Sequence, residues 1–196
     1  MRRLAALAML CGIGPLAAGC GSTPATHFYA LSSAGVPASP SSTRSVAVGP
    51  VSVPAVVDRP QIAISTGPNQ VWLDEFHQWA APLQNDIARV VAENLVTMLG
   101  TPRVTFFSQT LLAEPDYRVV IEVQRFASAP GEAATLDAVW TVSRGADGKS
   151  QTGRTSVREP TAGSSYEALA AAHSRAVARM SQDIADAVGA LDRPRS

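Results

Sequence analysis

The sequence predicts an α+β domain in which two amphipathic helices pack on one face of a mixed, mainly antiparallel sheet. Three observations predict this fold class. Apolar and polar side chains alternate over residues 117–123 and again over 136–142, which is the period of half-buried strands. Apolar side chains recur at helical spacing over two longer segments, 83–98 and 166–191. The turn residues at 130–131 indicate that the two alternating strands run antiparallel, as part of a meander.

The other strands follow from shorter patterns. Residues 45–53 alternate as a strand, but the phase slips at Gly49-Pro50, which predicts a bulge or bend there. Turn residues between two short apolar runs predict a hairpin, and a polar run late in the chain predicts an edge strand. We therefore expect further strands at 61–66 and 71–73 (the hairpin), at 103–107, and at 151–157 (the edge).

Both helices carry signals at their ends. Pro82 suits the first turn of the first helix, where a missing N–H costs nothing, and Gly100 is a natural left-handed terminator. Ser164 and Glu167 have the spacing of a capping box, which predicts that the second helix begins there.

The beginning of the chain predicts export and lipidation. Arg2-Arg3 precede a mostly apolar run, and small residues follow it, which is the pattern of a secretory signal over residues 1–19. Cys20 directly follows the small residues, and this arrangement resembles a bacterial lipobox. That resemblance implies cleavage before Cys20 and acylation of this residue. Two or three acyl chains anchor a protein firmly, whereas one holds it only marginally. An ordinary signal peptide with a chance cysteine is one alternative, and a short membrane helix is the other.

After Cys20 we expect a tether and then one domain. Residues 20–44 are rich in Ser, Thr, Pro, Ala and Gly, which is typical of a flexible linker. Within them, His27–Leu31 is too apolar for a linker, and we interpret it as a short strand that docks on the edge of the domain. Residues 45–193 then provide enough chain for a single hydrophobic core.

The composition argues against several classes of function. The 16 Lys and Arg side chains balance 16 Asp and Glu, so no basic field exists for nucleic acid. The chain has 2 cysteines. The lipobox resemblance implies that Cys11 leaves with the leader and that Cys20 is acylated. We therefore expect no disulfide, no cysteine-ligated metal, no cysteine nucleophile and no cofactor in the domain.

Sequence motifs of catalysis are absent as well. No nucleophile elbow, P-loop, dinucleotide fingerprint or zinc-protease motif occurs. His27, His77 and His173 share no spacing, and His173 lies on a core-facing helical stripe. We expect no enzyme activity. The remaining enzyme alternative is a periplasmic hydrolase whose Ser, His and carboxylate come from distant positions.

Two local stretches stand out as candidate binding residues. Asp58, Arg59 and Pro60 form a turn with a rigid proline, in which Asp58 caps the turn and Arg59 pairs with a carboxylate. Trp79 precedes Pro82 at the entry to the first helix. Trp79 either clamps a loop over the core or helps to form a groove that faces a partner.

The order of these features resembles a known family, the PqiC/YmbA lipoproteins, which are auxiliary components of ABC-type transport. The resemblance rests on the lipobox, on Phe28-Tyr29-Ala30-Leu31, on Asp58-Arg59-Pro60-Gln61-Ile62 and on Trp79-Ala80-Ala81-Pro82-Leu83, and it covers essentially the whole mature chain. This chain has Ala81 where the family often has an acidic residue.

The resemblance implies a non-enzymatic outer-membrane lipoprotein that faces the periplasm and works with an MCE-domain protein in lipid transport. Gly21 is not the Asp that retains many lipoproteins at the inner membrane, which favours the outer membrane. A homo-oligomeric ring around a symmetric partner is compatible with this role. An envelope-integrity or assembly lipoprotein is the alternative. We expect the partner to bind at Asp58, Arg59, Pro60, Trp79 and Pro82.

Overall fold

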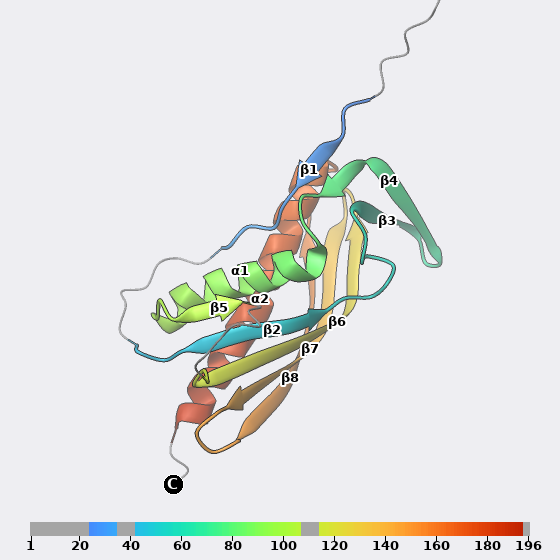
Figure 1. The fold of residues 1–196 in the computed structure, drawn as a ribbon. Coiled ribbons are helices and arrows are strands. Elements are labelled where there is room, and N and C mark those ends of the chain that lie inside the picture. Colours follow the sequence, from blue (N-terminus) through green and yellow to red (C-terminus); the bar gives the residue numbers. More distant parts are fainter. Residues whose placement is uncertain (1–23, 35–41, 107–113, 194–196) are drawn as a thin grey trace, which may run out of the picture.

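A computed structural model describes residues 24–34, 42–106 and 114–193 (Figure 1). The predicted leader, 1–19, and the predicted lipidation site, Cys20, lie outside the described residues. Within them the chain forms eight strands and two helices. In chain order these are β1 (His27–Tyr29), β2 (Val46–Ser52), β3 (Gln61–Gly67), β4 (Gln70–Trp79), α1 (Leu83–Leu99), β5 (Val104–Phe106), β6 (Tyr117–Ala129), β7 (Ala133–Arg144), β8 (Ser150–Pro160) and α2 (Tyr166–Asp192).

The strands form one mixed sheet with β6 at its centre. One edge of β6 pairs with β7, which pairs with β8, and these long pairings are antiparallel. The other edge of β6 pairs in parallel with β2 and, near its end, with β3. The β3–β4 hairpin is antiparallel, while β1 joins β4 and β5 joins β2 in parallel. The predicted α+β class with a mixed, mainly antiparallel sheet is therefore confirmed.

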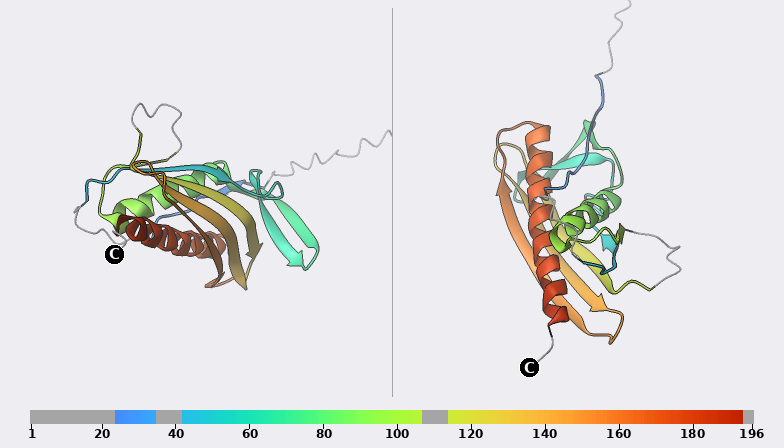
Figure 2. Two further views of the ribbon diagram at one scale, coloured as in Figure 1. Left: turned by 90° about the horizontal axis from the view of Figure 1, so that it is seen from below. Right: turned by 90° about the vertical axis from the view of Figure 1, so that its left-hand side faces the viewer.

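Both helices lie on the concave face of the curled sheet (Figure 2). Helix α2 runs across β7 and β8, and α1 lies beside it, over β2 and β5. The apolar stripes of both helices are buried against the sheet. Several polar side chains of the helices are buried as well, among them Asp86, Asn94 and Ser181. The predicted packing of two helices on one face is present.

The sequence underestimates β4. We expected a partner strand only at 71–73, but β4 continues to Trp79 because its second half pairs with β1. That pairing joins segments about fifty residues apart, so no local pattern predicts it. In β2, the register shifts between Val48 and Val51, which agrees with the bulge predicted at Gly49-Pro50.

The helix ends differ slightly from expectation. Gly100 ends α1 in the left-handed conformation, with φ of 61°, as predicted. Pro82 stands just before the first helical residue, and its carbonyl accepts the N–H groups of Asn85 and Asp86. The predicted capping box at Ser164 is wrong by one residue. Ser165 is the N-cap, and its Oγ accepts the N–H of Ala168 at 3.1 Å, so Glu167 stands one position too early to complete the box.

Residues 27–34, which we call the entry segment, are bound to the domain rather than extended from it. After β1 the chain passes over α1 and α2, and three of its backbone N–H groups donate to polar side chains of these helices. Leu31 N–H donates to Asp86 Oδ2 at 2.8 Å, Ser32 N–H to Ser174 Oγ at 3.0 Å, and Ala34 N–H to Asn94 Oδ1 at 3.1 Å.

Leu31 is the apolar anchor of the entry segment. Its side chain is only 2% exposed and belongs to the main core. Its carbonyl accepts Arg89 Nη2 at 2.7 Å, and Arg89 in turn pairs with the buried Asp86. A single residue is thus held by its side chain, its N–H and its carbonyl at once.

We expect Leu31→Ala to lower the free energy of unfolding by about 2–5 kcal/mol, because it removes a fully buried side chain and leaves a cavity. The control is Phe28→Ala, three residues earlier, which removes an aromatic side chain that is 64% exposed. Its effect should stay within about 0.5 kcal/mol. Urea denaturation measures both, and equal losses in the two variants would contradict a buried anchor at Leu31.

Candidate functional site

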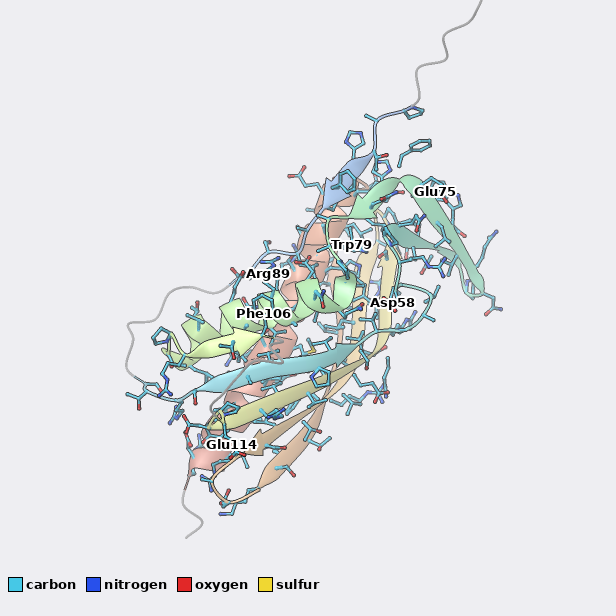
Figure 3. The ribbon with its side chains drawn as sticks, viewed as in Figure 1. Asp58, Glu75, Trp79, Arg89, Phe106 and Glu114 are labelled. Carbon is cyan, nitrogen blue, oxygen red and sulfur yellow. The ribbon has the colours of Figure 1, made fainter. Side chains whose placement is uncertain are left out.

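The five residues that the sequence singles out as candidate partner-binding residues surround one groove. It lies beside the N-terminal end of α1 and has a volume of about 440 Å³. Figure 3 shows Asp58 and Trp79 on this side of the molecule. We call it the α1 groove, and it is lined by Phe28, Asp58, Arg59, Pro60, Gln78, Trp79, Ala80, Ala81, Pro82 and Gln84.

The loop between β2 and β3 forms one wall of the α1 groove. The carbonyl of Pro54 accepts the N–H groups of Val57 at 3.0 Å and of Asp58 at 3.1 Å, which closes a tight turn. The side chain of Val57 is buried and fixes this turn to the core. Arg59 Nη2 reaches back to the carbonyl of Ala55 at 3.4 Å, so the predicted pairing of Arg59 with a carboxylate is replaced by a backbone contact.

Two backbone hydrogen bonds hold the segments of the α1 groove together, one to this wall and one to the entry segment. Trp79 N–H donates to the carbonyl of Pro60 at 2.7 Å, and Ala80 N–H donates to the carbonyl of Tyr29 at 2.7 Å. The two sequence motifs and the entry segment therefore meet at the end of β4. The α1 groove is built from three segments that are distant in sequence, and short hydrogen bonds fix their relative positions.

Trp79 is buried in the core and also lines the α1 groove. Its ring is only 5% exposed and packs edge-on against Phe126, with ring centroids 6.0 Å apart, and against His173, at 6.1 Å. It is therefore a core residue that also supports the floor of the α1 groove. Five further residues complete the lining, and the sequence did not point to them as binding residues: Phe28, Gln78, Ala80, Ala81 and Gln84. Phe28 could have been found, because it stands in the first motif of the family resemblance.

The α1 groove offers contacts suited to a protein partner. Asp58 and Arg59 are exposed and carry opposite charges, whereas Phe28, Pro60 and Pro82 present exposed apolar surface. Aromatic and arginine side chains are enriched among the residues that dominate binding energy at interfaces. Among the described residues, no group of three or more His, Cys, Asp or Glu side chains is arranged to hold a metal ion.

The model of the ABC-type transport auxiliary lipoprotein component matches residues 29–185, most of the chain. The chain belongs to this family. A search of curated proteins finds no match. The match begins at Tyr29, within the entry segment, so the segment that crosses the helices is part of the matched domain.

Solved structures share the fold of this auxiliary lipoprotein. The XCC0632 protein of Xanthomonas campestris is 20% identical, with a TM-score of 0.70, over 85% of this chain and 98% of the other. A second crystal structure, of a protein described as uncharacterized, is 19% identical, with a TM-score of 0.69, over 84% of this chain and 99% of the other. At these identities the likeness establishes the fold alone.

The auxiliary lipoprotein contains one Ser–His contact that bears on the hydrolase alternative. Ser128 Oγ lies 2.9 Å from His173 Nε2. Both residues are buried, and the ring of Phe126 stacks on His173 with centroids 3.8 Å apart. In the described part of the chain, His173 Nδ1 has no hydrogen-bond partner. This pair lies in the core, behind the Trp79 ring of the α1 groove floor, so a substrate reaches it only if the core opens.

Burial has an electrostatic consequence for His173. Removing the imidazolium from water disfavours its charged form and lowers the pKa of His173 to about 3. An unfolded histidine titrates near 6.5, so between these values the unfolded state binds more protons than the folded state. Stability is therefore fully present above about pH 6.5 and declines as the pH falls.

We expect the free energy of unfolding to fall by about 1.4 kcal/mol per pH unit between about pH 6 and 4.5 because of this one residue. His173→Gln, which cannot be protonated, should reduce that slope. Ser128→Ala is the matched control, since it loses a buried hydrogen bond at a cost of about 1 kcal/mol but keeps the histidine and hence the slope. Urea denaturation across this pH range measures all three, and identical slopes in the parent and His173→Gln would contradict the assignment.

Proposed function

We propose that this protein is a non-catalytic outer-membrane lipoprotein and an accessory subunit of an intermembrane lipid transport system of the MCE/ABC type. In this role its domain docks the periplasmic MCE-domain protein at the outer membrane through the α1 groove. The family match supports the coarser part of the proposal, an auxiliary component of ABC-type transport.

The main support for the docking role is the convergence at the α1 groove. The five candidate residues belong to two separate sequence motifs, yet all five line one groove: Asp58, Arg59, Pro60, Trp79 and Pro82. Side chains that serve only their own local turns have no reason to converge. The groove is also held by backbone hydrogen bonds before any partner arrives, and such preorganisation reduces the entropic cost of binding.

The anchor in this proposal is Cys20. Acyl chains on this residue hold the processed protein to a bilayer, and Gly21 after it favours the outer membrane over the inner one. Among the described residues, no helix is long and apolar enough to cross a membrane. A lipid anchor would therefore supply the membrane attachment that the described helices do not.

A ring of several copies fits this arrangement. A symmetric assembly presents the same docking surface several times, and identical binders then occupy it with matching symmetry. In such a ring each copy contributes its own acyl anchor, which strengthens the attachment of the whole assembly to the membrane.

We expect the double variant Asp58→Ala/Arg59→Ala to bind the MCE-domain protein at least about tenfold more weakly than the parent, a loss of about 1.4 kcal/mol or more. The matched control is Glu132→Ala/Arg158→Ala, which removes an exposed acid–base pair between the β6–β7 turn and β8. Such surface pairs add little to stability, so both double variants should fold. Titration of the purified lipoprotein with an MCE-domain protein of the same organism measures the affinities.

The outcomes separate the parts of the proposal. Loss of affinity in the groove variant alone supports docking at the α1 groove. Equal affinities in the parent and both variants would move the docking surface elsewhere on the domain. A folded, acylated lipoprotein that does not bind the MCE-domain protein would contradict the transport role and favour an envelope-integrity or assembly lipoprotein that binds another component.

A further inference from the structure

The hairpin of β3 and β4 carries apolar surface that neither the core nor the α1 groove uses. It projects away from both helices (Figure 2), with β1 beside its base. Near its tip, the turn at 67–70, the side chains of Val71 and Trp72 are 49% and 54% exposed. Trp72 pairs with Ile64 across the hairpin and Val71 with Ser65, so the two apolar side chains point to opposite faces. An apolar tip of this kind is not explained by packing within the domain.

The outer part of the hairpin is also free of charge. No Asp, Glu, Lys, Arg or His occurs from Gln61 to Leu73. The first charged residues of β4 are Asp74 and Glu75, and Figure 3 shows Glu75 at the bend of the strand, away from the tip. A charged group is costly to move into a membrane, whereas tryptophan is enriched at the boundary between lipid and water. The composition of the tip therefore suits a lipid surface.

The position of the entry segment determines how far the hairpin can lie from the anchor. His27 pairs with His77 in the parallel ladder of β1 and β4. From Cys20 to His27 the chain spans at most about 25 Å when fully extended. From His77 back to Gln70 the strand is at most about 24 Å long. These two lengths allow the hairpin tip to reach the bilayer that holds the acyl chains on Cys20.

The joint between β1 and the hairpin is rigid. His77 stacks on Tyr166 of α2 with ring centroids 3.9 Å apart, and it stacks on His27 at 5.5 Å. Asp74 accepts the hydroxyl of Tyr166 and lies 3.0 Å from His77 Nδ1. This cluster of β1, β4 and α2 side chains fixes the direction in which the hairpin leaves the domain.

We propose that the tip of the β3–β4 hairpin, through Val71 and Trp72, enters the interfacial layer of the bilayer that holds the acyl chains of Cys20. The inference rests on the anchor of the proposed function but not on the MCE partner. The hairpin and the acyl chains give the domain two points of contact with the membrane. Two contacts fix its orientation, so that the α1 groove is held in one direction relative to the membrane plane.

The test measures contact between Trp72 and lipid. The full chain, acylated in cells, is reconstituted into vesicles of phosphatidylethanolamine and phosphatidylglycerol, with and without bromine on the acyl chains. Bromine quenches tryptophan emission only at close range. The other two tryptophans, Trp79 and Trp140, are buried, so Trp72 is the tryptophan that lipid can reach.

We expect brominated vesicles to lower the emission of the parent protein, and we expect this loss to disappear in Trp72→Phe. The matched control is Trp72→Phe/Val120→Trp, which moves the exposed tryptophan to β6, where Val120 is also exposed. Its emission should be the same in both kinds of vesicle. Iodide in the aqueous phase should quench Trp72 less in vesicle-bound protein than it quenches the tryptophan at 120 in the control.

Flotation of the vesicles separates failure of this inference from failure of the anchor. A chain that floats with the vesicles but shows no bromine quenching would overturn the hairpin contact and leave the anchor intact. Protection of Trp72 from both bromine and iodide would mean that a second copy of the chain covers the tip. That result would also overturn the proposed contact between the hairpin and lipid. A chain that does not float would overturn the anchor at Cys20 and the hairpin contact together, while binding to the MCE-domain protein is measured independently.

Discussion

The structure depends on the clamp that Asp86 and Arg89 place on Leu31. The Asp86 carboxylate accepts the N–H of Leu31, the Arg89 guanidinium donates to its carbonyl, and the two side chains pair with each other (Figure 3 labels Arg89 on α1). Each charge thereby gains partners that compensate for its removal from water. The clamp closes over a leucine side chain in the main core, so polar and apolar interactions secure the same residue.

This clamp determines where everything attached to the entry segment lies. Tyr29 accepts a hydrogen bond from Ala80 and so joins the entry segment to the α1 groove, while Phe28 adds an exposed ring to the groove wall. His27 stacks on His77 at the base of the β3–β4 hairpin. The chain that leads from the proposed anchor therefore reaches the groove and the hairpin within a few residues. If Cys20 carries the proposed anchor, the anchor lies seven residues before the start of β1.

The periodic patterns in the sequence predict the long strands and helices that bury one face. The meander of β6, β7 and β8 and both helices follow from alternation and helical stripes, because burial on one face imposes those periods. The pairing of β1 with β4 is invisible in the sequence, since its strength comes from a distant partner and a three-residue strand carries no period of its own. The five candidate groove residues lie in two sequence motifs that the sequence shows directly. Their convergence depends on long-range hydrogen bonds, such as that from Trp79 N–H to the carbonyl of Pro60, and these are not visible in the sequence. The sequence also does not predict that Trp72 is exposed, because an apolar strand residue is buried only where another element, such as a helix, covers it.

Hydrogen exchange of the backbone amides of Leu31, Ser32 and Ala34 tests most directly that the entry segment is part of the folded core. The Leu31 amide lies in the buried clamp and opens only when the domain unfolds, so it should exchange as slowly as the amides of β6 and α1. The hydrogen bonds of Ser32 and Ala34 are only partly buried, so these two amides should be protected, but less strongly than that of Leu31. Exchange at the rates of an unstructured chain, while β6 and α1 remain protected, would contradict the account. The entry segment would then be a loose tether, and the anchor would no longer fix the position of the groove or the hairpin.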